Sequence, residues 1–200
     1  MSEQLEIEFK TLLTQAEYQR LLTHFTVAET DFITQTNHYF DTPTYELQAL
    51  GCGLRIRQFA QNGELTLKSP QTVGLLETTD LLDETELNTL LMQKKIKQTG
   101  TVAQKIQSLG IEPRTVQPFA TLTTKRAEIE LPEGLVALDQ SWYSEQVDYE
   151  LELEVTNEQA TVASFLQLLT HLEIAYKPSQ NKIQRAKQAQ VIPPKNESAN

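Results

Sequence analysis

Residues 6 to 10 read Glu-Ile-Glu-Phe-Lys, an alternation of charged and apolar side chains. In an extended strand successive side chains point to opposite faces, so Glu6, Glu8 and Lys10 share one face. Carboxylate oxygens suit hard divalent cations such as Mg²⁺, and a neighbouring ammonium suits an anionic ligand. An ordinary half-solvated strand fits the same pattern, because exposed faces of antiparallel sheets are polar.

Charged side chains alternate with apolar ones in other segments of the chain. Arg55 and Arg57 alternate with Leu54 and Ile56. The other charged positions on such faces are Lys68, Arg126, Glu128, Glu130, Asp139, Glu150, Glu152 and Glu154. Basic residues dominate the segment 54–68, and carboxylates dominate the first and last strands.

These faces allow two interpretations. If they line one cavity, an acidic wall that concentrates divalent cations opposes a basic wall whose arginines bind phosphate oxygens. Gathering like charges in a lumen costs stability unless a ligand, a metal or water compensates. If the faces lie on the outer surface, water solvates the same charges at no such cost. The alternation alone leaves both open.

Local signals delimit the elements that carry these residues. Thr14 with Glu17 and Asp83 with Glu86 predict two capping boxes, and Asn62-Gly63 predicts a tight turn. Strands are expected over residues 3–11, 34–41, 54–59, 65–68, 74–81, 116–131, 135–143 and 147–155. Helices are expected from Thr14 to about residue 25 and over 44–49, 84–96, 102–109, 158–172 (capped by Thr156 or Asn157) and 180–189.

About eight strands joined by short connections favour antiparallel pairing. The predicted fold class is α+β, an eight-stranded antiparallel β-barrel or tunnel with helices packed outside. We expect one domain over residues 3–190, followed by a Pro-rich, polar and disordered tail over 191–200.

Composition excludes several classes of protein. The net charge of −10 over 200 residues argues against nonspecific binding to nucleic acid or acidic lipid. The single cysteine, Cys52, permits neither an intrachain disulfide nor a cysteine zinc site. No apolar run reaches the roughly 20 residues that span a bilayer, and the N-terminus lacks signal-peptide character. The expected location is cytoplasmic, and monomer and homodimer remain open.

Taken in order, these residues resemble the CYTH, or triphosphate tunnel metalloenzyme, superfamily, and most closely its short stand-alone bacterial members. The motifs that carry the resemblance are Glu6-x-Glu8-x-Lys10, Tyr39-Phe40-Asp41-Thr42, Leu54-Arg55-Ile56-Arg57, Lys68, Arg126, Asp139, the Glu-x-Glu pairs at 150–154, Lys182 and Arg185. The resemblance implies a tunnel that binds a triphosphate and uses Mg²⁺ or Mn²⁺. Members hydrolyse inorganic, thiamine or nucleoside triphosphates, or cyclise ATP.

The resemblance also implies a role for each matched residue. Metal ligands would be Glu6, Glu8, Glu150, Glu152 and Glu154, with Glu152 and Glu154 favoured as the late pair. The phosphate ligands would be Lys10, Arg55, Arg57, Lys68, Arg126, Lys182 and Arg185, with Lys177 as another candidate for the C-terminal position. Catalytic roles would fall to Glu6, Glu8, Lys10 and Asp139. The predicted activity is metal-dependent triphosphate hydrolysis; the alternatives are a class IV-type adenylyl cyclase and a non-catalytic sensor.

Overall fold

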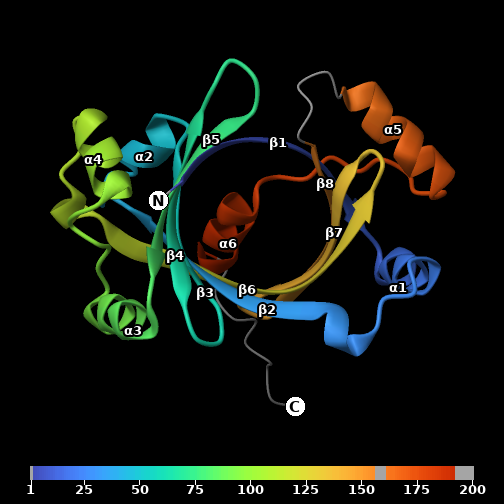
Figure 1. Ribbon diagram of the computed structural model, residues 1–200, viewed down its shortest axis with the longest axis horizontal. Helices are drawn as coiled ribbons and strands as arrows, with labels where there is room; N and C mark the ends of the chain where they lie inside the picture. The colour runs from blue at the N-terminus through green and yellow to red at the C-terminus, as the bar shows by residue number, and fades with distance from the viewer. Residues whose placement is uncertain (1, 156–160, 192–200) are drawn as a thin grey trace, which may run out of the picture.

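A computed structural model describes residues 2–155 and 161–191 of the chain. Its eight strands close into an antiparallel barrel in the order β1-β5-β4-β3-β2-β6-β7-β8, as Figure 1 shows. The strands are β1 (Ser2–Leu13), β2 (Phe32–Asp41), β3 (Gly53–Gln58), β4 (Gly63–Pro70), β5 (Leu75–Leu82), β6 (Gln117–Leu131), β7 (Gly134–Tyr143) and β8 (Gln146–Val155). The predicted eight-stranded antiparallel barrel is confirmed.

Within residues 2–155 and 161–191, six α-helices and two short 3₁₀ helices fill the connections and follow the last strand. The helices are α1 (Gln15–His24), α2 (Glu46–Ala49), α3 (Glu84–Gln93), α4 (Thr101–Ser108), α5 (Val162–His171) and α6 (Lys182–Val191), with 3₁₀ turns at η1 (Glu29–Asp31) and η2 (Pro113–Thr115). None of the helices in the described ranges has the length and apolar character needed to cross a bilayer.

Strand register fixes which side chains face the lumen. Directly opposed residues of an antiparallel pair share a face. Lys10 opposes Glu152, and Arg126 opposes Asp139. The charged faces of adjacent strands therefore align around the barrel, and the apolar faces point outward to the helices.

Two outer cores hold the barrel in shape. One packs the outward residues of β1, β7 and β8, including Ile7 and Leu151, against α1 and α5, including Phe165. The second packs β3 and β4 against α2, α3 and α4. Burial of these apolar faces supplies the main driving force for folding.

A third core lies on the lumen side of β6. Ala186 and Ala189 of α6 pack against Tyr39, Leu122 and Tyr143. Figure 1 shows α6 at the opening of the barrel, whereas α1, α3, α4 and α5 lie around its outside. The alanines let α6 approach the sheet closely, and this position carries its first residue into the lumen.

Most local signals are confirmed, with some shifted boundaries. The Thr14 hydroxyl accepts from the Glu17 amide at 3.2 Å, and the Glu17 carboxylate accepts from the Thr14 amide at 2.6 Å. The Asp83 carboxylate accepts from the Glu86 amide at 2.8 Å and so caps α3, but the reciprocal half of the predicted capping box is not formed, since the Glu86 carboxylate pairs with Lys97 at 2.8 Å. α3 ends at Gln93 rather than near residue 96, because Lys94 adopts a left-handed conformation (φ 55°).

The C-terminal elements also differ from the expected ranges. α5 is capped by Thr161, whose hydroxyl accepts from the Ser164 amide at 3.3 Å. The expected caps Thr156 and Asn157, with residues 158–160, lie outside the described residues. α6 extends to Val191, one residue into the expected tail, and residues 192–200 also lie outside the described residues.

Candidate functional site

The barrel encloses a cavity of about 400 Å³ that opens toward α2 and α6. The predicted site residues that line it are Glu6, Glu8, Lys10, Arg55, Arg57, Lys68, Arg126, Glu152 and Lys182. A smaller adjoining cavity of about 20 Å³ shares Glu6, Glu8, Arg126 and Glu152 and adds Glu128 and Glu154. The charged strand faces therefore meet in a lumen, which excludes the outer-surface interpretation for these residues.

The basic wall consists of Arg55, Arg57 and Lys68. The Lys68 ammonium lies between Glu6, at 2.5 Å, and Glu77, at 2.9 Å. Arg55 pairs with Glu77 at 3.4 Å. These two cations are thus held in place by carboxylates while their side chains still reach the cavity.

Arg57 differs from its neighbours on this wall. Its Nε donates to the Asn37 side chain at 3.2 Å, and within the described part of the chain it forms no ion pair with a carboxylate. Burial and the nearby charges of Arg55 and Arg126 lower the pKa of Arg57 to about 10. Because burial and the two neighbouring guanidinium groups outweigh the attraction of Glu77 and Glu64, an anionic ligand would stabilise the Arg57 cation.

Opposite the basic wall lies a buried network of ion pairs. Arg126 donates to both oxygens of Asp139, at 2.7 and 2.6 Å, and also bonds Glu152. The Lys182 ammonium contacts Asp139 at 2.7 Å, Glu150 at 2.6 Å, and Glu152. Burial opposes ionisation of Asp139, but Arg126 and Lys182 outweigh it and lower the pKa of that carboxyl.

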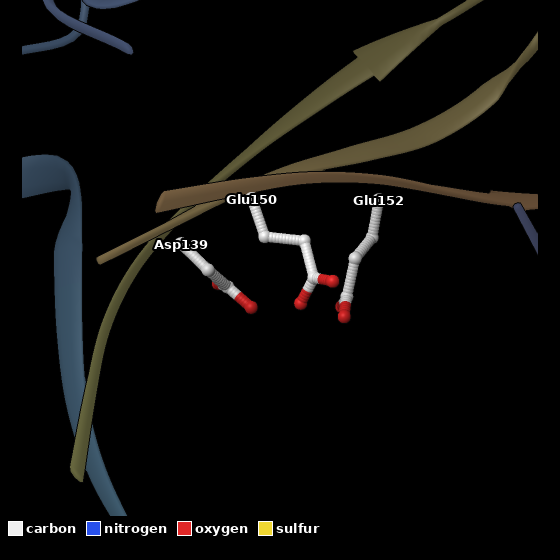
Figure 2. A group of neighbouring side chains, drawn as sticks. All are labelled: Asp139, Glu150 and Glu152. Carbon is white, nitrogen blue, oxygen red and sulfur yellow. The ribbon is translucent and has the colours of Figure 1, made fainter. Parts of the chain in front are cut away.

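Asp139, Glu150 and Glu152 converge closely enough to hold a cation, as Figure 2 shows. Their ligand oxygens lie within 4.8 Å of one another. Lys182 already contacts all three. As arranged here, the cluster binds an ammonium, and a metal ion at the same point would have to displace Lys182.

A second group of carboxylates is only partly compensated, with Lys68 paired to Glu6 at 2.5 Å and Lys10 paired to Glu8 at 2.8 Å. Burial, with Glu77 and Glu8, raises the pKa of Glu6 although Lys68 lowers it. Burial, followed by Glu77 and Glu8, also raises the pKa of Glu154. Oxygen donors that repel one another in this way fit a hard divalent cation such as Mg²⁺ or Mn²⁺. Glu6, Glu8 and Glu154, which line the smaller cavity together with Glu152, are therefore a second candidate for a metal ion. Among the described residues, only the cluster around Lys182 brings its carboxylate oxygens within 4.8 Å of one another.

Lys10 lies on β1 opposite Glu152 of β8, among the carboxylates of both strands. Its ammonium donates to Glu8 at 2.8 Å. Burial lowers its pKa, but Glu8 and Glu152 more than offset this and raise it. Lys10 is therefore charged at neutral pH and lines the cavity beside the carboxylates.

Of the three candidates for the C-terminal phosphate ligand, Lys177, Lys182 and Arg185, only Lys182 lines the cavity. Lys182 reaches the lumen, whereas Lys177 pairs with Glu17 at 2.6 Å beside α1. Arg185, expected to bind phosphate, does not line the cavity; it pairs with Asp148 at 3.0 Å and Glu150 at 2.7 Å. Arg185 follows Lys182 by almost one helical turn of α6. Its two ion pairs with residues of β8 fix α6 on that strand, whereas it contributes nothing to the cavity lining.

Glu150 likewise does not line either cavity, and its oxygens are taken by Arg185, Lys182 and Ser179. Ion pairs and a hydrogen bond thus occupy its oxygens here, and its role as a metal ligand stays a prediction.

Sequence reasoning missed two residues of these charged faces. Glu77 was placed in a strand without a role, although it pairs with both Arg55 and Lys68. Asn37, which is buried and bonded to Arg57, lies beside the matched Tyr39 motif. The alternation of side chains along the expected strand was the available signal for Glu77. In the structure Glu77 opposes Lys68 in the β4–β5 ladder and therefore shares its face.

Comparison with known proteins assigns the family. The CYTH domain family matches residues 4–186, nearly the whole chain. The chain is 38% identical over 188 residues to the Bacillus subtilis (strain 168) protein named "Putative triphosphatase YjbK", covering 92% of this chain and 95% of that protein. This chain therefore belongs to the CYTH family.

Solved structures agree with this assignment. A crystal structure of a Bacillus halodurans protein named "putative adenylate cyclase" is 36% identical, with a TM-score of 0.86 over 92% of this chain and 98% of that one. The Hippeastrum protein HpAC1, described as having a dominant triphosphatase activity, shares the fold at 21% identity, with a TM-score of 0.76 over 95% of this chain and 98% of that one.

Proposed function

We propose that this chain hydrolyses a triphosphate compound that binds with Mg²⁺ or Mn²⁺ in the barrel lumen. The observation that carries the proposal is a single cavity whose lining combines the cations Arg55, Arg57 and Lys68 with the carboxylates Glu6, Glu8 and Glu152. Among the described residues Arg57 forms no ion pair with a carboxylate, and burial with the charges of Glu77 and Glu8 raises the pKa of both Glu6 and Glu154. A triphosphate would add negative charge beside Arg57, and a divalent cation would add positive charge beside the carboxylates. The name of the Bacillus subtilis relative supports this assignment.

The residues of the chain have separate tasks in this proposal. Arg55, Arg57 and Lys68 bind phosphate oxygens and orient the phosphate chain, since guanidinium groups match those oxygens in geometry. Lys10 and Arg126 neutralise negative charge on the phosphoryl group under attack. Lys182 also contributes positive charge to the binding of the phosphates while its ammonium stays paired with Asp139. In this proposal the cationic side chains are thus already in position in the lumen before the phosphoryl group reacts.

Glu6, Glu8 and Glu154, with Glu152 beside them, would hold the metal ion. A bound divalent ion activates water and stabilises charge on phosphate oxygens. The overall reaction adds water across a phosphoric anhydride bond, which breaks to give orthophosphate and the shortened phosphate compound. Asp139 orients Arg126 through two hydrogen bonds and so acts as a positioning residue in this proposal.

A product assay tests the proposal. Purified protein is incubated with Mg²⁺ or Mn²⁺ and either tripolyphosphate or ATP, and the products are separated. Orthophosphate release that disappears with a chelator supports hydrolysis, and Glu8→Gln should abolish it while leaving a folded protein. Wild-type activity in Glu8→Gln would refute the metal assignment.

Cyclisation of ATP is the second candidate, favoured by the name of the Bacillus halodurans relative. It would give pyrophosphate and cyclic AMP in the same assay. Saturable binding without any product would identify a sensor and would contradict both enzymatic proposals.

A further inference from the structure

Strand β2 carries uncharged polar side chains into the lumen, between the basic wall of β3 and the ion pairs of β6. Gln35 and Asn37 line the cavity, and their exposed fractions are only 5% and 2%. Asn37 opposes Arg57 in the β2–β3 ladder. Arg126 opposes Ile33 in the β2–β6 ladder, two residues before Gln35 and therefore on the same face. The two amides thus lie on a strand between two guanidinium groups, and the proposed function uses neither amide.

The hydrogen-bond partner of Arg57 distinguishes it from the other predicted phosphate ligands in the cavity. Each of the others pairs with at least one carboxylate; they are Lys10, Arg55, Lys68, Arg126 and Lys182. Arg57 instead donates its Nε to the Asn37 side-chain oxygen at 3.2 Å. An amide oxygen holds a guanidinium in place without adding a negative charge. The two terminal nitrogens of Arg57 therefore keep their full charge for a ligand.

Gln35 offers a second, unused amide beside this arginine. Within the described part of the chain its side chain forms no hydrogen bond, although the residue is buried and faces the cavity. A buried polar group without a partner is costly, and a ligand or water satisfies such groups in native proteins. The NH₂ group of a glutamine donates two hydrogen bonds, so Gln35 suits an anion at this point.

An anion between Arg57 and Arg126 would also relieve an unfavourable arrangement of charges. Burial and the charges of Arg55 and Arg126 lower the pKa of Arg57. A phosphate oxygen in this place would attract both guanidinium groups and accept from the Gln35 amide. Geometry, burial and charge thus favour the same ligand.

We propose that Asn37 and Gln35 complete a phosphate subsite with Arg57 and Arg126 in the lumen. Asn37 is a positioning residue: it orients Arg57 and, being neutral, leaves the guanidinium charge to the phosphate. Gln35 is a direct ligand, whose amide donates to a phosphate oxygen. The proposal rests on the proposed function for the presence of a triphosphate in the lumen. It adds two uncharged residues that determine how tightly the phosphates bind.

Calorimetric titration of the full chain with tripolyphosphate tests the subsite. A chelator removes divalent cations, so that turnover does not disturb the titration. Asn37→Asp keeps an acceptor for Arg57 at almost the same volume but adds a negative charge, and Gln35→Leu removes the amide at similar volume. Thr34→Asp and Thr34→Leu are the matched controls, because Thr34 is an exposed residue of β2 that does not line the cavity.

We expect Asn37→Asp to bind tripolyphosphate at least about tenfold more weakly, because its carboxylate pairs with Arg57 and repels the ligand. Gln35→Leu should bind about tenfold more weakly, the effect of one lost hydrogen bond to a charged group. Both Thr34 variants should stay within about twofold of the wild type, since solvent screens their position. Wild-type affinity in Asn37→Asp or in Gln35→Leu would overturn the proposal, while orthophosphate release from tripolyphosphate would still uphold the proposed function.

The positioning role of Asn37 has a readout that general damage to the site would not give. Ligand-free Asn37→Asp should unfold at the same temperature as the wild type or at a higher one, because its carboxylate compensates a buried cation. Affinity and stability would then change independently or in opposite directions. A lower unfolding temperature together with weaker binding would overturn the positioning role.

A double-variant cycle shows whether Asn37 acts through Arg57. Asn37→Ala should weaken tripolyphosphate binding by at least about fivefold in the wild-type background, but by less than about twofold when Arg57→Met is already present. Equal losses in both backgrounds would refute the action through Arg57.

The titration also separates this subsite from the proposed function. If the wild type binds tripolyphosphate but releases no orthophosphate with Mg²⁺ or Mn²⁺, the proposed function fails, and the same affinity losses in Asn37→Asp and Gln35→Leu still support the subsite. Absence of tripolyphosphate binding by the wild type, with and without Mg²⁺, would refute the subsite.

Discussion

The Lys182 ammonium lies 2.7 Å from the fully buried Asp139 carboxylate, so the first residue of α6 is tied to β7 deep in the barrel. Because of this ion pair, the position of α6 and the charges of the lumen depend on each other. Both groups are taken out of water, and each depends on the other for its charge.

Replacement of Lys182 by Met should destabilise the protein by about 3 kcal/mol, because a buried network would lose one cation. Urea unfolding followed by circular dichroism measures the change. In the double variant Lys182→Met with Asp139→Asn, part of the lost stability should return. If the double variant loses the sum of both single effects, the two residues do not interact energetically.

Arg57→Met should raise the stability of the ligand-free protein by about 1 kcal/mol, since the variant removes a buried cation repelled by Arg55 and Arg126. The same variant should bind tripolyphosphate at least about tenfold more weakly, because a charge-assisted hydrogen bond is lost. Thermal unfolding and calorimetry measure the two effects. Unchanged affinity in Arg57→Met would show that Arg57 does not bind phosphate.

Glu154→Gln should stabilise the metal-free protein near neutral pH. The pKa of Glu154 is raised on folding by burial, Glu77 and Glu8, so its ionised form is less favourable in the folded state. The folded protein then binds more protons than the unfolded chain between the ordinary glutamate pKa of 4.5 and the raised value. Its contribution to stability therefore increases as the pH falls through this window.

The expected gain of Glu154→Gln is about 0.5 kcal/mol at pH 7, because solvent screens a half-exposed carboxyl. Unfolding curves at pH 7 and pH 5 check the sign: the difference between variant and wild type should shrink at the lower pH. Added Mg²⁺ should raise the unfolding temperature of the wild type more than that of the variant. A growing difference at pH 5 would contradict the raised pKa.

Glu77→Gln should strengthen binding of tripolyphosphate by about threefold, because it removes a negative charge beside Arg55 and Lys68. The affinity gain should fall as salt is added, since exposed charge interactions are screened. Titrations at two salt concentrations measure both effects. Glu84→Gln is the control: it removes an exposed acidic side chain of α3 that does not line the cavity. Weaker binding in Glu77→Gln would mean that Glu77 mainly positions the two cations.

Tyr18→Phe should leave the stability unchanged or raise it by up to about 1 kcal/mol. Among the described residues the buried Tyr18 hydroxyl has no hydrogen-bond partner, and burial raises the pKa of Tyr18 to about 12. The phenylalanine ring retains the contact with Tyr149, whose ring centre lies 4.9 Å away. Denaturant unfolding measures the difference; a loss above about 1 kcal/mol would indicate that the hydroxyl is bonded in solution.

The sequence by itself determined the strands and the charges that share a face of each strand, because the two-residue period of a strand is local. The short connections between the strands favoured antiparallel pairing. Glu6, Glu8, Lys10, Arg55 and Arg57 could therefore be assigned to common faces before any pairing was known. The same parity would have included Glu77, but a single carboxylate in a strand has no chemical meaning until its neighbours are placed.

Only the tertiary structure decided how the charges are shared. Barrel closure brings β1 beside β8 and β5, so that Lys68 meets both Glu6 and Glu77 from different strands. The packing of α6 places Lys182 in the lumen and directs Arg185 to Asp148 and Glu150. These partners are distant in sequence, and their distances depend on strand register and helix docking, which no local pattern encodes.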